Sequence, residues 1–310
     1  MIDNEMIPID LKSVWDRLPL HEPPLIDNIL RRNQKLMIKG PSKSGKTMLS
    51  IQLAVAISEG KEWLGNQCDQ GKVLYINFGL PTYSMFSRVR EIYTALNIAP
   101  ENLDDINILN YKGNYLARNY TQFIDHMKNI ASENEYKLII VDCMDYVQGF
   151  YNTEAGRDII RLLDNLILQI NTCIAFTTSI DNPLVSNLCE SLIELIPTEE
   201  RAISDYRLSI ETSTFPPKNQ ELIKINYPIV QRIGSSYNEH KMSLANKLKK
   251  EKSLKELEGA FDLLNTKGDG VDVNKLASYL GIARESLYRK IKKFEGFEIS
   301  SGVVERINNT

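Results

Sequence analysis

Residues 35–47 read KLMIKGPSKSGKT, and this stretch decides the fold. The first five residues form a short, mostly apolar run that is typical of a buried strand. The next eight match the pattern GxxxxGK[ST], and apolar residues then recur with a helical period at Leu49, Leu53, Ala54 and Ile57. A strand, a Gly/Ser-rich turn and a helix in this order predict a phosphate-binding loop.

Each residue type in the loop has a physical role. Glycines allow consecutive N–H groups to converge on an anion, and the following helix adds its positive end. Lys46 can reach the β- and γ-phosphates, while the Thr47 hydroxyl and a carboxylate at Asp142, which ends the apolar run KLIIV, can hold Mg²⁺. A turn or helix-cap aspartate is the alternative for Asp142. The predicted nucleotide-binding residues are Gly40, Pro41, Ser42, Lys43, Ser44, Gly45, Lys46 and Thr47.

Strands and helices alternate through the first two thirds of the chain, which predicts an α/β fold with a mainly parallel sheet covered by helices on both faces. Strands are expected at 35–39, 73–78, 106–109, 137–141 and 172–177, and helices at 47–58, 82–96, 120–131 and 156–168. Later strand-like runs at 192–196, 206–212 and 221–227 include an antiparallel hairpin. The expected organisation is an irregular segment (1–34), a core (35–232), a linker (233–252) and a C-terminal domain (253–310).

Composition excludes several classes of protein. The longest apolar runs are strand-sized, no basic and apolar leader opens the chain, and the four cysteines show no CxxC spacing. A membrane span, a secretory signal and a zinc or disulfide framework are therefore not expected. We expect a cytoplasmic protein without a membrane partner.

Four stretches together resemble the RepA-like branch of the RecA-fold ATPases, which are encoded by phages, plasmids and other mobile elements and relate to hexameric replicative helicases. These are residues 25–47, 71–81 (GKVLYINFGLP), 137–142 (KLIIVD) and 206–217 (YRLSIETSTFPP). The resemblance covers roughly residues 20–230. It implies a RecA-like P-loop core that binds ATP and Mg²⁺ between the subunits of a homo-oligomeric ring or filament.

The sequence departs from the family pattern at three places. Gly79 stands where the family usually carries the glutamate that activates water, Thr177-Thr178-Ser179 replaces a His-containing motif, and Ser213 stands where an arginine finger is common. A glycine cannot act as a base, so these departures predict weak or lost hydrolysis. If the alignment is shifted, the base is one of Asp145, Glu154 and Asp158, and the finger one of Arg157, Arg201 and Arg232.

The C-terminal part is basic. From residue 241 onward the chain has 14 basic and 10 acidic residues, whereas the net charge of the whole chain is −3. Residues 271–293 (VDVNKLASYLGIARESLYRKIKK) resemble a helix-turn-helix, and residues 297–307 resemble a two-stranded wing. Residues facing outward from the second helix would contact double-stranded DNA, and they are Arg284, Ser286, Tyr288, Arg289, Lys292 and Lys293. A protein-interaction cap with a solvated charged face is the alternative.

The sequence thus predicts an ATP- and DNA-binding protein that serves replication or maintenance of a mobile element, with weak or lost ATP hydrolysis. Two other functions stay open. One is an active hexameric replicative DNA helicase, and the other is a regulator or adaptor that binds DNA under the control of ATP.

Overall fold

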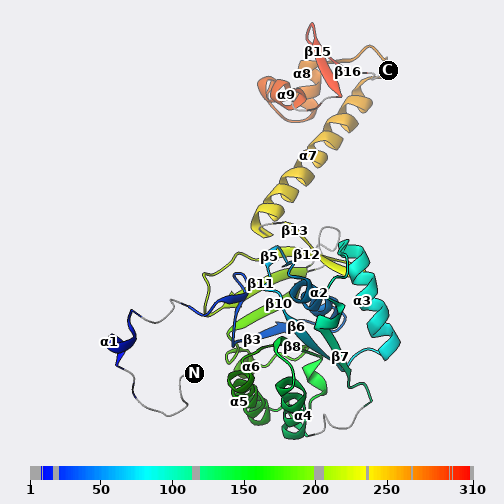
Figure 1. Cartoon of the computed structure of the whole chain (residues 1–310). Helices are drawn as coiled ribbons and strands as arrows, with labels where there is room; N and C mark the ends of the chain where they lie inside the picture. The colour runs from blue at the N-terminus through cyan, green and yellow to red at the C-terminus, as the bar shows by residue number, and fades with distance from the viewer. Residues whose placement is uncertain are drawn as a thin grey trace. The chain divides into compact units, whose positions relative to one another are not determined.

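The structure is a computed structural model that describes residues 8, 10–16, 21–113, 119–198, 206–234, 237–266, 268–292, 294 and 296–307. The chain divides into two compact units, Met1–Tyr237 and Asn238–Thr310 (Figure 1). None of the helices in the described ranges combines the length and the apolar character that a bilayer crossing requires.

A nine-stranded sheet forms the centre of the first unit, with the strand order β13-β12-β11-β10-β3-β9-β8-β6-β7. Six adjacent strands run parallel, as predicted: β10 (Ser191–Pro197), β3 (Lys35–Lys39), β9 (Cys173–Thr178), β8 (Tyr136–Asp142), β6 (Lys72–Asn77) and β7 (Ile106–Asn110). Three strands continue the sheet antiparallel to their neighbours: β11 (Tyr206–Thr212), β12 (Glu221–Asn226) and β13 (Ile229–Gly234). The sequence predicted the hairpin of β11 and β12 but missed β13.

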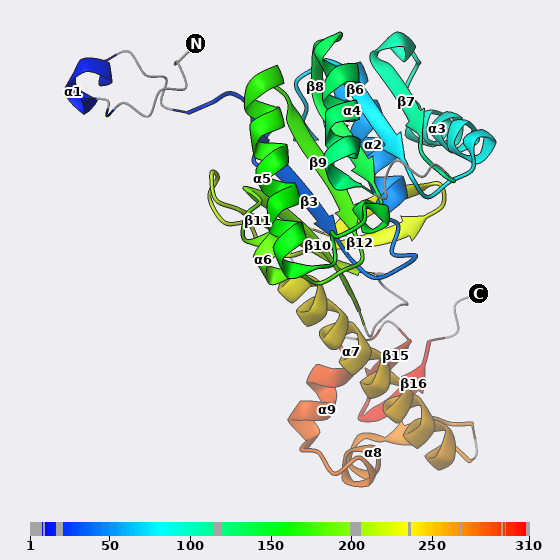
Figure 2. The same ribbon diagram turned by 90° about the horizontal axis from the view of Figure 1, so that it is seen from below.

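Helices cover both faces of this sheet. The helices α2 (Lys46–Glu59) and α3 (Thr82–Leu96) bury their apolar residues in one core cluster. The helices α4 (Tyr120–Ser132) and α5 (Thr153–Ile170) bury theirs in a second cluster on the other face, where Figure 2 shows the two running side by side. The predicted α/β architecture is confirmed. It could be predicted because strands that are buried on both faces are nearly continuous apolar runs in the sequence.

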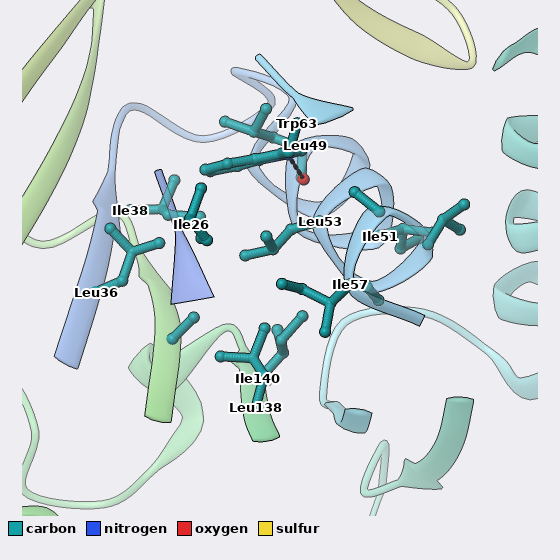
Figure 3. Close-up of a cluster of buried hydrophobic side chains, with 14 of the residues drawn as sticks. Ile26, Leu36, Ile38, Leu49, Ile51, Leu53, Ile57, Trp63, Leu138 and Ile140 are labelled. Atoms are coloured by element: carbon teal, nitrogen blue, oxygen red, sulfur yellow. Dashed lines mark hydrogen bonds between the residues drawn. The ribbon is translucent and has the colours of Figure 1, made fainter. Parts of the chain in front are cut away.

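The helix that follows the phosphate loop is anchored deep in the core. Leu49, Leu53 and Ile57 of α2 lie against side chains of the central strands, as Figure 3 shows. The indole of Trp63 belongs to this cluster and donates a hydrogen bond from Nε1 to the Leu49 carbonyl oxygen at 3.1 Å. Burial on this scale fixes the position of α2 and of the loop that precedes it.

The segment before the first parallel strand differs from the sequence prediction of an irregular region. The short strands β1 (Pro24–Ile26) and β2 (Leu30–Arg31) pair antiparallel, and a single helical turn, α1 (Leu11–Val14), precedes them. The prolines exclude a helix at 23–24 but are compatible with an edge strand. The hairpin belongs to the core, because its apolar side chains are almost fully buried: Leu25, Ile26, Ile29 and Leu30.

The second unit has a hydrophobic core of its own. It contains three helices, α7 (Tyr237–Leu264), α8 (Val273–Tyr279) and α9 (Arg284–Ile291), and a three-stranded antiparallel sheet of β14 (Val271–Asp272), β15 (Phe297–Ser300) and β16 (Val303–Arg306). Gly281 has φ +64° between α8 and α9, where glycine is favoured. The stretch expected as a linker is helical from Tyr237, because its Lys- and Leu-containing sequence continues the helix that buries Leu257 and Phe261.

Candidate nucleotide-binding site

The loop at residues 40–47 joins the end of β3 to the start of α2, as the motif predicts. Gly45 caps the helix with φ +84°, a left-handed conformation that other residues adopt only with strain. At Gly40 a Cβ atom would lie 2.8 Å from Leu195 Cβ, so no larger residue fits without a shift. Gly45 is therefore favoured by its backbone conformation, and Gly40 by the close approach of Leu195.

The loop presents donors for an anion. The Ser44 N–H donates to the Pro41 carbonyl oxygen at 3.3 Å, whereas in the described part of the chain the N–H groups of Lys43 and Gly45 donate to no protein acceptor. The N-terminus of α2 begins at Lys46, so its positive end faces the same space. Free amides beside a helix N-terminus fit a phosphate group.

The Lys46 side chain lies back along its own loop. Its Nζ donates to the carbonyl oxygens of Gly40 at 2.7 Å and Pro41 at 2.8 Å, and to Ser179 Oγ at 3.1 Å. Burial lowers the pKa of Lys46, and the nearby charge of Asp145 opposes that change. A phosphate would offer the buried ammonium a charged acceptor, which forms stronger hydrogen bonds than neutral carbonyls do.

Asp142 ends β8 directly beside the loop and is fully buried. Its Oδ1 accepts hydrogen bonds from Thr47 Oγ1 at 3.2 Å and from Thr177 Oγ1 at 2.8 Å. Its Oδ2 is buried without a hydrogen-bond partner among the described residues. Burial raises the pKa of Asp142, and the neighbouring hydroxyl groups of Thr177, Thr47 and Tyr75 oppose this.

These residues fit a hard divalent cation. A buried carboxylate oxygen without a partner is costly, and Mg²⁺ prefers such oxygen ligands. Thr47 and Asp142, which the sequence assigned to Mg²⁺, lie within hydrogen-bond distance although they are 95 residues apart in the chain. Mg²⁺ bound there would neutralise phosphate charge, and Thr47 Oγ1 and the Asp142 carboxylate are the groups that would hold it.

The loop after β6 carries the first departure from the family pattern. Asn77, the last residue of β6, accepts from the Leu80 N–H at 2.9 Å and donates from Nδ2 to the Leu80 carbonyl oxygen at 2.7 Å. These bonds clamp the turn that contains Gly79. A Cβ atom at Gly79 would meet only Cys143 Sγ, at an ordinary 3.5 Å, so the backbone does not require glycine there.

Of the three alternative bases, Asp145 is the residue that contacts the site. Its Oδ2 accepts from the Ser179 N–H at 2.9 Å, and its Oδ1 accepts from the Thr178 hydroxyl. Since Ser179 also contacts Lys46, Asp145 is linked to the phosphate-loop lysine through one residue. By contrast, Glu154 is exposed on α5, and Asp158 pairs there with Arg161 at 3.6 Å.

The candidates for an arginine finger lie elsewhere. Ser213 follows β11 and is held by the Glu190 carbonyl oxygen at 2.9 Å. The strand register pairs the preceding residue, Thr212, with Ser191, which places Ser213 at the edge of the sheet opposite the phosphate loop. Arg232 is bound to Glu221 at 2.7 Å and to the Leu64 carbonyl oxygen at 2.7 Å. Arg157 is exposed on α5, and Arg201 lies outside the described residues.

The residues predicted to contact DNA lie in the second unit, mostly on α9. Ser286 is half-buried, the others that the structure describes are exposed, and Lys293 lies outside the described residues. The exposed residues are Arg284, Tyr288, Arg289 and Lys292. Arg284 Nη2 donates to the Tyr288 hydroxyl at 3.4 Å, one helical turn away. The sequence therefore predicted an exposed, basic helix face, but not the contacts within it.

The fold and the loop define a P-loop nucleotide-binding domain. Residues 9–173 match the family described as AAA domain. The match covers more than half of the 310 residues, and the chain belongs to this family of P-loop ATPases. The matched region includes the phosphate loop, Gly79 and Asp142. Membership of this family implies nucleotide binding, usually with Mg²⁺. No curated protein matches the chain.

Proposed function

We propose that the first unit binds ATP together with Mg²⁺ through residues 40–47 and Asp142. The observation that carries this proposal is the convergence of Lys46, Thr47 and Asp142, with Asp142 Oδ2 buried and unpaired. In this function Lys46 holds phosphate oxygens, the free N–H groups of the loop bind the same anion, and Thr47 and Asp142 hold the cation.

We further propose that hydrolysis is slow. No carboxylate is available at Gly79, and both oxygens of Asp145 already accept hydrogen bonds, from Thr178 and Ser179. A residue that replaces a general base must take a proton from water, and a carboxylate whose two oxygens each already accept from a fixed donor is poorly placed to do so. Ser213 cannot supply the positive charge of an arginine finger, which contributes about 10³–10⁵ in rate in enzymes that use one.

For the second unit we propose a winged helix-turn-helix that binds double-stranded DNA. Support comes from its separate core, the left-handed Gly281 between α8 and α9, and the exposed cations of α9. With the resemblance to RepA-like proteins, this suggests a role in replication or maintenance of a mobile element. ATP would then lie between subunits of a ring or filament and control assembly on DNA.

Two other functions make different predictions. A replicative helicase requires DNA-stimulated ATP hydrolysis and strand separation. An ATP-controlled regulator or adaptor requires binding to specific duplex sequences without unwinding. Steady-state phosphate release with and without single-stranded DNA, together with particle size with and without ATP, separates them.

Our proposal predicts slow phosphate release under both conditions and larger particles with ATP. Lys46→Ala, which lacks the ammonium group proposed to hold phosphate, is the negative control in each assay. Stimulated turnover of about 1 s⁻¹ or more, within the range of competent enzymes, would favour the helicase instead.

A further inference from the structure

The second unit contains a groove between α7 and α9 that no motif predicted. It has a volume of about 670 Å³, and four cationic side chains from the two helices line it: Lys249 and Lys250 from α7, and Arg289 and Lys290 from α9. Ser253 and Ser286 add hydroxyl groups, and the nearly buried ring of Phe294 adds an apolar surface. The two α7 lysines fall in the stretch 233–252, for which the sequence predicts a linker.

The described residues provide no ion-pair partner for the positive charge in this groove. Among the described side chains, no carboxylate lies within ion-pair distance of Lys249, Lys250, Arg289 or Lys290. Arg289 donates from its Nε to the carbonyl oxygen of Glu285 at 3.4 Å. Cations gathered in a groove beside an apolar surface produce a strong local potential that attracts anions.

The next turn of α7 has a different character. A smaller depression there is lined by Glu251, Lys252, Lys255 and Glu256, in which acidic and basic residues are balanced. The lysines of α7 are therefore not equivalent, because those facing α9 meet further cations and those on the neighbouring surface meet carboxylates. A helix face that only contacts solvent would not require lysines near other cations to be kept apart from lysines near carboxylates.

The groove also divides the residues that the sequence assigned to DNA contact. Ser286 and Arg289 line it, whereas Arg284 and Tyr288 contact one another and lie outside it. Buried Leu287 and Ile291 hold α9 against the core of the unit, so the spacing between the two helices is fixed. The cations of α7 and α9 thus line one surface.

We propose that this groove binds the phosphodiester backbone of one strand of duplex DNA, so that α7 contributes as much to the affinity as α9. Ammonium and guanidinium groups bind phosphate oxygens, the serine hydroxyls can donate to the same oxygens, and the apolar ring suits the sugar. Contacts of this kind set affinity and position but read no sequence. The inference rests on the proposed DNA-binding function and assigns it a surface.

The test compares two double variants of the full chain with equal charge change on the same helix. Lys249→Gln/Lys250→Gln removes the α7 half of the groove, and Lys252→Gln/Lys255→Gln is the matched control. Binding to a short duplex of mixed sequence is followed by fluorescence anisotropy at several salt concentrations. Each lost phosphate contact lowers the slope of log K against log [salt] by about 1.

We expect the groove variant to bind about tenfold or more weakly at moderate salt and to lose about two units of slope. The control should change affinity by less than about twofold. Lys249→Arg/Lys250→Arg, which keeps the charge, should restore binding. Equal weakening in the groove and control variants would overturn the inference while leaving DNA binding intact. Absence of duplex binding by the wild-type protein would overturn the DNA-binding proposal itself, and the groove inference with it.

Discussion

The Thr47 hydroxyl donates a hydrogen bond to Asp142 Oδ1 over 3.2 Å, and this contact joins the start of α2 to the end of β8. Parallel strands end at the same edge of a sheet, so the residue that closes β8 comes to lie beside the loop that follows β3. The second carboxylate oxygen of Asp142 remains buried and unpaired among the described residues. The arrangement is suited to a cation that both side chains share.

Asp142→Asn should remove most of the effect of Mg²⁺ on nucleotide affinity. The substitution keeps the shape of the side chain but removes its negative charge, which a hard cation requires. Mg²⁺ raises the affinity of the wild type for ATP, and we expect this increase to be smaller by about tenfold or more in the variant. The affinity for ATP in the presence of a metal chelator should stay near that of the wild type. Titration calorimetry with and without Mg²⁺ gives both values. An unchanged gain from Mg²⁺ in the variant would remove Asp142 from the metal site.

The same variant should be more stable than the wild type without nucleotide at neutral pH. Burial raises the pKa of Asp142, so the folded state binds a proton more readily than the unfolded state. The wild type therefore loses stability as the pH rises from the ordinary carboxyl value through the raised pKa. Asparagine does not titrate. We expect the free energy of unfolding of Asp142→Asn at pH 7 to exceed that of the wild type by on the order of 1 kcal/mol.

Urea unfolding followed by tryptophan fluorescence measures this difference, because Trp63 is buried in the core of the first unit. The advantage of the variant should shrink as the pH falls toward about 4, because the folded state, with its raised pKa, takes up the proton there while the unfolded state is only about half protonated. A constant difference between pH 7 and pH 4 would mean that the charge of Asp142 has no part in it.

Gly79→Glu should increase ATP hydrolysis. The position accepts a side chain, since an added Cβ meets only Cys143 Sγ at 3.5 Å. A general base contributes about 10²–10⁴ in rate, and because Ser213 leaves the finger missing, we expect the lower end of that range. Phosphate release at saturating ATP measures the effect.

Gly79→Gln is the matched control for that experiment, because it has the same size and cannot take a proton. Its rate should equal that of the wild type. Equal stimulation by glutamate and glutamine would show that the side chain acts through the conformation of the loop. Fast hydrolysis by the wild type would show that another residue, such as Asp145, already serves as the base.

The sequence predicted the elements that carry the site because they are local. The strand at 35–39, the glycines and the helical period that follows require no tertiary information, and β8 could be predicted from its apolar run up to Asp142. The contact between Asp145 and Ser179 could not be predicted, since it depends on β8 and β9 being neighbours in the sheet. Strand β13 pairs with β12 across the two residues Tyr227-Pro228. It was missed because its apolar run is short, Ile229 and Val230, and directly follows a proline, which weakens the strand signal.

Burial of the N-terminal hairpin was also not visible in the sequence, and it leads to a stability prediction. Leu30 is fully buried, whereas Leu11 in α1 is 60% exposed. Leu30→Ala should lower the free energy of unfolding of the first unit by about 2–5 kcal/mol, and Leu11→Ala should change it by less than about 0.5 kcal/mol. Urea unfolding of both variants checks this. Similar, small losses would mean that the hairpin is not part of the core.

We propose that the phosphate loop holds ATP and that the chain hydrolyses it slowly, and a single experiment tests both statements. The full chain is mixed with an equal amount of ATP and Mg²⁺, and the protein-bound nucleotide is separated and identified over several minutes. We expect the bound nucleotide to be mostly ATP throughout and Lys46→Ala to retain almost none. Complete conversion of the bound nucleotide to ADP within seconds, or equal retention by Lys46→Ala, would contradict the proposal.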